Sequence, residues 1–158
     1  MRQDRFLFWI LIGIGAVILI ALGLFIFRRV EVTYLPEDTP AGVLNNYALA
    51  LHQGDYPRAY QYLATGNNRP SYPDFRQWFL SDTSLSGASL IINDTTAEKD
   101  EAVVGVTILT SNGPFADTNR QKENASLLKQ NGVWKISLAP YPYWRWEWLQ
   151  PTVKATPQ

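Results

Sequence analysis

The residues that could carry chemistry in this chain are few and scattered. His52 is the only histidine and cysteine is absent, so the chain can build neither a histidine-pair metal site nor a thiol nucleophile. His52 lies near the end of a predicted helix, where a positive charge interacts favourably with the helix dipole. Asp55 and Asp74 stand at the N-termini of predicted helices, where such residues are favoured. We therefore predict no catalytic residue, no metal and no cofactor, and a protein that is not an enzyme.

A polar stretch in a presumed strand, residues 118–124, is the first candidate binding site. Arg120, Lys122 and Asn124 share one face of that strand, and Gln121 and Glu123 share the other. A strand that covers a core should alternate apolar and polar residues. The first face is interpreted as possible pocket lining that offers positive charge to an anionic ligand. The alternative is a hairpin arm that extends beyond the core into water.

The second candidate site is the aromatic stretch "YPYWRWEW", residues 141–148. Five of its eight residues are aromatic, and an extended chain would place Trp144, Trp146 and Trp148 on one face. Three interpretations stay open: the stretch covers apolar surface of its own domain, docks onto a partner subunit, or contacts the membrane interface. We expect at least one tryptophan buried in the domain and one against a partner. The candidate interface residues are Tyr141, Tyr143, Trp144, Arg145, Trp146 and Trp148.

An uncharged apolar segment occupies residues 6–27, after a short N-terminal tail of residues 1–5. At ~1.5 Å per residue a helix of this length reaches ~33 Å, enough for a hydrocarbon core of ~30 Å. The sequence therefore predicts a single membrane-spanning signal anchor. The alternative is a signal peptide cleaved after the small residues Ala21 and Gly23.

Small residues on one face of this helix suggest a packing surface. Gly13, Ala16 and Gly23 would let another transmembrane helix approach closely, although glycine and alanine are common in spans. Basic residues flank the segment equally, with Arg2 and Arg5 before it and Arg28 and Arg29 after it. The N-terminal amine tips the balance towards a cytoplasmic N-terminus. The expected localisation is a single-pass membrane protein with residues 30–158 on the extracytoplasmic side.

After a linker over residues 28–38, helix signals precede strand signals within one domain of residues 39–139. Thr39, Asp55 and Ser71 are suitable N-caps for three helices, each followed by apolar residues at helical spacing. Strands are predicted at residues 87–94, 101–110, 119–129 and 132–138. Asn131-Gly132 is a strong hairpin signal because both residues tolerate positive φ. This order predicts an α+β fold, with three helices on one face of an antiparallel sheet. A C-terminal tail follows over residues 140–158.

Two stretches resemble known domains. "LHQGDYPRAYQYLA", residues 51–64, resembles the helix–Gly-Asp-Tyr–helix opening of nuclear transport factor 2-like domains. "LLKQNGVWKIS", residues 127–137, is similar to their closing hairpin with its Gly-x-Trp-x-Ile run. The resemblance implies a cone in which three helices pack on a curved four-stranded sheet that can enclose a pocket. Members of this superfamily include isomerases, hydratases, transport adaptors and non-catalytic domains. No polar set like that of its enzymes can be matched here.

The charge balance limits the classes of partner that the chain is expected to bind. The chain has 14 basic and 14 acidic residues, and this neutrality argues against a nucleic-acid partner. The predicted function is that of a non-catalytic accessory subunit in a larger membrane complex, with the bilayer and other membrane-protein subunits as partners. The alternative is a membrane-anchored ligand-binding or sensing module that uses the cone pocket. A small-molecule ligand is possible, but no residue pattern supports one.

Overall fold

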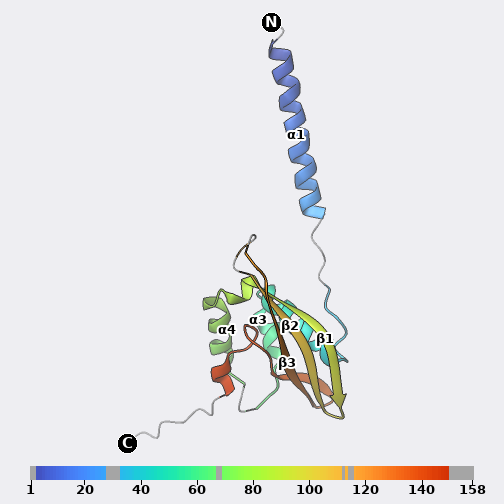
Figure 1. Ribbon diagram of the computed structural model, residues 1–158, viewed down its shortest axis with the longest axis vertical. Coiled ribbons are helices and arrows are strands. Elements are labelled where there is room, and N and C mark those ends of the chain that lie inside the picture. The colour runs from blue at the N-terminus through green and yellow to red at the C-terminus, as the bar shows by residue number, and fades with distance from the viewer. Residues whose placement is uncertain (1–2, 28–32, 67–68, 112, 114–115, 150–158) are drawn as a thin grey trace, which may run out of the picture. The chain divides into compact units, whose positions relative to one another are not determined.

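The computed structural model describes residues 3–27, 33–66, 69–111, 113 and 116–149, and within residues 3–27 it describes the side chains of residues 8–23. The chain forms two compact units, Met1–Thr33 and Tyr34–Gln158. The first contains the helix α1 (Gln3–Phe27). The second contains the remaining helices and all described strands (Figure 1).

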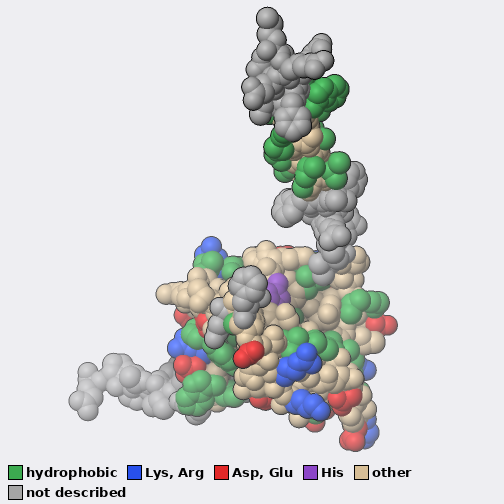
Figure 2. Space-filling model, turned by 45° about the horizontal axis from the view of Figure 1, so that its top comes forward, with side chains coloured by type: hydrophobic (Ala, Val, Ile, Leu, Met, Phe, Trp, Pro, Cys, Tyr) green, Lys and Arg blue, Asp and Glu red, His purple; other side chains and the backbone are tan. Residues whose placement is uncertain are grey.

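The described side chains of α1, residues 8–23, are almost all apolar and exposed (Figure 2). Within the part of the chain that the structure describes, no helix is both long and apolar enough to cross a membrane. The prediction of a membrane-spanning signal anchor over residues 6–27 is therefore wrong for the described residues.

Three helices of the second unit begin at the caps that the sequence predicts. They are α2 (Pro40–His52), α3 (Tyr56–Gln61) and α4 (Tyr72–Ser81). The side chain of Thr39 accepts a hydrogen bond from the Gly42 backbone N–H. Asp55 and Ser71 accept in the same way from the third residue after each of them. Each cap supplies a partner for an N–H that the first helical turn leaves unpaired.

A four-stranded antiparallel sheet in the order β1-β2-β3-β4 follows the helices. A short 3₁₀ helix, η1 (Ser84–Gly87), leads into β1 (Ala88–Glu98) and then β2 (Glu101–Thr110). The sheet continues with β3 (Asn119–Gln130) and β4 (Val133–Leu138). At the β3–β4 turn, Asn131 and Gly132 have φ values of 55° and 81°. The α+β prediction and its antiparallel sheet are thus confirmed, although β1 runs past the predicted residue 94.

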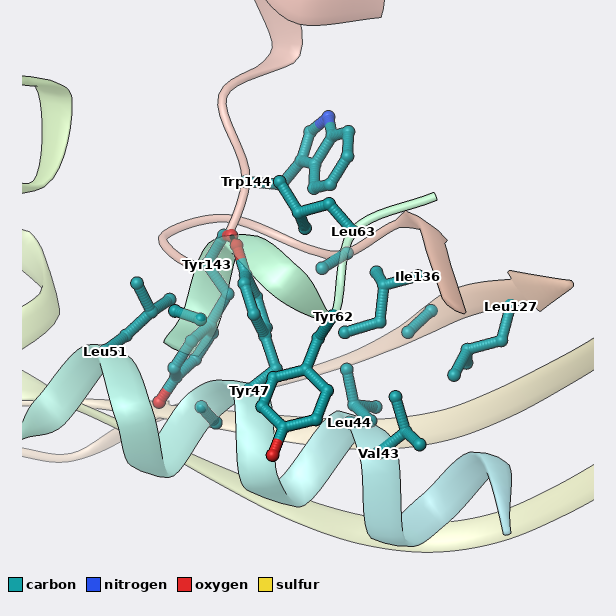
Figure 3. Close-up of a cluster of buried hydrophobic side chains, with 14 of the residues drawn as sticks. Val43, Leu44, Tyr47, Leu51, Tyr62, Leu63, Leu127, Ile136, Tyr143 and Trp144 are labelled. Carbon is teal, nitrogen blue, oxygen red and sulfur yellow. Dashed lines mark hydrogen bonds between the residues drawn. The ribbon is translucent and has the colours of Figure 1, made fainter. Parts of the chain in front are cut away.

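The core lies between the helices and one face of the sheet (Figure 1). On the sheet side it contains alternate residues of β2 and β3, among them Val104, Val106 and Leu127. Trp134 and Ile136 continue this face on β4. The helices contribute Leu44, Tyr47 and Phe75, and the C-terminal segment adds Tyr143 and Trp144 (Figure 3). The alternation of β2 and β4 predicts the sheet side of this core correctly.

The end of the predicted linker is part of the domain. The fully buried Asn46 donates to the Leu35 carbonyl at 2.8 Å and accepts from the Leu35 N–H at 2.7 Å. The Arg58 guanidinium lies over the Tyr34 ring, 3.3 Å from its centroid. Residues 34–38 therefore fold against the domain instead of linking it to the preceding helix.

Candidate functional site

The C-terminal segment, residues 139–149, is fixed to the core by Tyr143. The Tyr47 hydroxyl donates to the Tyr143 carbonyl at 2.6 Å, and the Tyr143 hydroxyl lies 2.9 Å from His52 Nε2. Figure 3 shows Tyr143 beside Tyr47 within the cluster of buried side chains. These contacts join residues more than 90 positions apart in the chain. They hold the segment against α2.

This network is electrically neutral at neutral pH. Burial raises the pKa of both Tyr47 and Tyr143 above its usual value, so both hydroxyls stay protonated. Partial burial lowers the pKa of His52 and favours its neutral imidazole. His52 is thus a hydrogen-bonding partner of Tyr143. Its neutral ring does not make the favourable charge interaction with the helix dipole that the sequence suggested.

A groove opens between α4 and the C-terminal segment, which lie side by side in Figure 1. We call it the α4–C-terminal groove. One part is a cavity of about 340 Å³ with a mostly apolar lining. Its rim carries large exposed side chains, since Tyr141 is 60% and Trp146 64% exposed. The lining residues are Trp78, Leu138, Ala139, Tyr141, Trp144, Arg145, Trp146, Glu147 and Leu149.

The other part of the groove is a more polar cavity of about 570 Å³. Arg145 stands between the two parts, with its guanidinium 4.5 Å from the centroid of the Trp78 ring. It pairs with Glu147, with Nη2 to Oε1 at 3.1 Å and Nε to Oε2 at 3.0 Å. The hydrogen bond from Arg145 lowers the pKa of Glu147 below its usual value. The carboxylate therefore stays ionised at neutral pH and cannot act there as a proton donor.

The aromatic candidates do not form one face. Residues 146–149 make a short 3₁₀ helix, η2 (Trp146–Leu149), so an extended chain is the wrong geometry there. Trp144 is buried and Trp148 packs against it, with ring centroids 5.3 Å apart, while Trp146 points to solvent. Trp148 also contacts Phe75 and Phe79 of α4. Of the predicted interface residues, Tyr143 and Trp144 are core, Arg145 and Trp148 are half-buried, and Tyr141 and Trp146 remain exposed.

The polar strand candidates lie on the face of the sheet turned away from the helices. Val104 pairs with Ala125 on the core face, so Gln121 and Glu123 share that side. Arg120, Lys122 and Asn124 take the opposite side, and all three are exposed. They cannot line a pocket between the helices and the sheet. Both faces of this end of β3 are exposed, in agreement with the alternative of an arm in water.

The remaining candidate is the small-residue face of α1, and no packing partner is described for it. A Cβ atom at Gly13 or Gly23 would meet no atom within 4 Å outside its own helix, and Ala16 is exposed. The packing role of Gly13, Ala16 and Gly23 stays a prediction.

Neither a metal cluster among the described residues nor a basic patch on the face seen in Figure 2 is present. Among them, no group of three or more His, Asp or Glu side chains could hold a metal ion. Figure 2 shows basic and acidic side chains interspersed on the visible face of the domain, without a basic patch. A nucleic-acid site would need positive charge gathered on one surface.

Sequence reasoning missed three residues of the groove and its surroundings. Trp78 was not among the candidate site residues, yet it lines both parts of the groove. Arg69 went unnoticed, although its guanidinium lies over the Tyr60 ring, 4.1 Å from the centroid. Asn46 sits among apolar residues of α2. A polar residue in an apolar run was the signal that could have found it, because buried amides need partners.

Comparison with known proteins identifies the fold. No protein-family model and no curated protein matches the sequence. A SEC-C motif containing protein from Rhodopseudomonas palustris matches with a TM-score of 0.51 and 14% identity, over 66% of this chain and 79% of that one. A nuclear transport factor 2-like protein of unknown function from Shewanella oneidensis MR-1 matches with a TM-score of 0.50 and 15% identity, over 65% and 95%. A candidate ketosteroid isomerase from Shewanella frigidimarina NCIMB 400 matches with a TM-score of 0.50 and 22% identity, over 66% and 96%.

These likenesses concern architecture and not activity, because one fold supports many functions. One neighbour carries an enzyme name and another is of unknown function, so the fold includes proteins named as enzymes. The helices, the antiparallel sheet and the closing hairpin match the expectation from residues 51–64 and 127–137. The second unit of this chain has the nuclear transport factor 2-like fold.

Proposed function

We propose that this domain is a non-catalytic accessory subunit that holds a partner protein at the α4–C-terminal groove. The observation that carries the proposal is the exposed apolar rim of the groove. Tyr141, Trp146 and Leu149 surround a cavity whose wall includes the indoles of Trp78 and Trp144. Exposed tryptophan and tyrosine beside an apolar pocket are typical of interface hot spots.

The chemistry of the groove favours binding over catalysis. Arg145 and Glu147 neutralise each other, and the low pKa of Glu147 removes it as an acid at neutral pH. Asp74 accepts a hydrogen bond from the Ser71 hydroxyl at 2.6 Å as part of the α4 cap. These carboxylates thus have structural partners, as does the Tyr141 hydroxyl, which lies 2.6 Å from Ser84 Oγ. The indole of Trp146 is 64% exposed and has no such partner among the described residues.

The alternative of a sensing module with its ligand inside the cone has less support. Fully buried Tyr47, Phe75 and Tyr143 occupy the space between the helices and the sheet. The basic residues Arg120 and Lys122, which that hypothesis required, lie on the opposite face. A ligand in the cone would have to displace well-packed aromatic side chains, and this is costly.

Quantitative co-purification tests the proposal. The full chain would be tagged in its native host, and partners would be measured by mass spectrometry against an untagged strain. We expect the double variant Tyr141→Ser with Trp146→Ser to lose the partner, because a hot-spot tryptophan contributes about 2 kcal/mol or more to binding. The matched control is Leu80→Ser, which removes an exposed apolar side chain of α4 outside the groove. Equal recovery with both variants would refute the groove as the docking surface.

A further inference from the structure

Unpaired hydrogen-bond donors gather around the groove. Among the described residues, four buried side-chain nitrogens have no hydrogen-bond partner: Arg69 Nε, Trp78 Nε1, Trp144 Nε1 and Arg145 Nε. All four are donors, and all four residues line adjoining cavities. Arg145 Nε lies 3.0 Å from the Glu147 carboxylate, so this ion pair supplies its acceptor. The other three lack any acceptor, and a buried donor without an acceptor destabilises the folded chain.

Arg69 is held in place without a counter-charge. Its Nη2 donates to the Tyr60 carbonyl at 3.1 Å, and its guanidinium stacks on the Tyr60 ring. The ion pairs found among the described residues are Arg58 with Glu37 and Arg145 with Glu147. The Arg69 charge is therefore oriented by a ring and a carbonyl, and no described carboxylate lies within ion-pairing distance of it.

The cavity shared by Arg69 and Trp144 has a volume of about 280 Å³. Among the described residues that line it, Arg69 alone is charged, and the others are Ala64, Thr65, Gly66, Leu128, Ser137 and Trp144. The hydroxyls of Thr65 and Ser137 already donate to Gln130 Oε1 and to the Ser126 carbonyl. The free donors are those of Arg69 and Trp144. The Trp144 side chain is only 3% exposed, and Figure 3 shows its nitrogen directed away from the apolar cluster.

We propose that this cavity is a binding site for a single carboxylate group. One guanidinium without a counter-ion matches a ligand with one negative charge. The planar edge of a guanidinium can donate two parallel hydrogen bonds to a carboxylate, and the Trp144 indole N–H supplies a third. Binding would pair donors that are otherwise buried without acceptors. The site does not involve Trp146 and stands independently of the proposed docking function.

The test follows the indole N–H signals of the full chain by ¹⁵N–¹H NMR while sodium propionate is added. Trp144→Phe identifies the Trp144 signal. We expect a saturable shift of that signal, absent with sodium chloride at the same ionic strength. Arg69→Gln should weaken the apparent Kd about tenfold or more, since hydrogen bonds to charged groups are the strong ones. Arg69→Lys keeps the charge but loses the planar guanidinium, and its Kd should lie between those of the wild type and Arg69→Gln.

Arg76→Gln is the matched control, because Arg76 is exposed on α4 and lines neither this cavity nor the groove. Its spectrum and Kd should equal those of the wild type. An equal shift with chloride, or equal Kd values for the wild type and Arg69→Gln in a folded variant, would overturn the site. Tighter binding of inorganic phosphate than of propionate would overturn its assignment to a monoanion.

The source of the carboxylate is decided by a second set of probes. Acetyl-triglycine with a free C-terminal carboxylate is compared with its amide and with propionate. Tighter binding of the free-acid peptide than of propionate would support the chain terminus of another protein as the source. Equal binding of the two acids would support a free small acid. Binding of the amide as tight as that of the acid would contradict carboxylate recognition.

Discussion

The β3–β4 hairpin and the C-terminal segment follow each other along the chain, yet they are stabilised in different ways. The hairpin is formed by a main-chain ladder between neighbours in sequence, with Lys129 opposite Trp134 and a two-residue turn. Ile136 adds main-chain hydrogen bonds to Tyr62 and Ala64. The C-terminal segment is held by side chains of distant elements, with Tyr143 bonded to α2 and Trp148 packed on α4. The turn of the hairpin thus depends on backbone conformation, whereas the C-terminal segment depends on the packing of side chains from distant elements. Mutations can separate the two.

Tyr143→Ala should have the largest effect, because it removes the side chain that fixes the segment. The ring is fully buried, and truncation of a buried large aromatic costs about 3–5 kcal/mol. Urea unfolding of the full chain, monitored by far-UV circular dichroism, would measure the loss. Tyr141→Ala, two residues away but exposed, removes one exposed hydrogen bond to Ser84 and should cost no more than about 1 kcal/mol. Similar values for the two variants would show that the segment does not depend on Tyr143.

Trp148→Ala should rank second. This half-buried indole contacts Phe75, Phe79 and Trp144, so we expect a loss of about 2–3 kcal/mol, below that of a fully buried aromatic. The same unfolding experiment on Trp146→Ala provides the comparison and should show almost no change. If Trp146→Ala were the more destabilising variant, the arrangement of the 3₁₀ helix would be wrong.

Gly132→Ala tests the hairpin alone. Gly132 has a φ of 81°, where a Cβ atom is unfavourable, and we expect a loss of about 1 kcal/mol. Gly113→Ala is the control, because a Cβ atom there meets no neighbour within 4 Å and no positive φ is involved. Thermal unfolding of both variants would measure the difference. No difference between them would remove the evidence that turn conformation fixes the hairpin.

His52 should give the smallest effect, visible as a dependence on pH. Its pKa is lowered in the folded chain, so the unfolded chain binds a proton first as the pH falls through about 6.5. Stability should therefore be full above this pH and decrease below it. The melting temperature at pH 8 and pH 5.5 would show a smaller difference for His52→Gln than for the wild type. An NMR titration that placed the His52 pKa above its usual value would reverse the sign.

The sequence contains most of the fold because the caps and hairpins act over short distances. Thr39, Asp55 and Ser71 each reach an N–H three residues away, and Asn131-Gly132 defines its own turn. Such features need no knowledge of the rest of the molecule. The alternation of β2 predicts its buried face for the same reason.

The candidate site was much less predictable because its geometry depends on packing between distant elements. Alternate tryptophans suggest an extended chain, but η2 places Trp144 and Trp148 in contact and leaves Trp146 exposed. No local pattern indicates that Trp78 would meet Arg145, since the two lie on different elements. Arg120 and Lys122 were correctly placed on one face of a strand, but their own sequence cannot say which side the helices cover.

Asn46 recognises position 35 through main-chain atoms only, one donor and one acceptor. The Leu35 side chain plays no part in this recognition and is 46% exposed. The attachment is therefore tolerant of sequence: nineteen amino acids can provide the required N–H and carbonyl, and proline alone lacks the donor. Evolution, or a protein engineer, could exchange the residue at this entry point freely. A foreign residue at position 35 would keep these two hydrogen bonds, whereas the contacts of Tyr34 and Glu37 with Arg58 depend on their side chains.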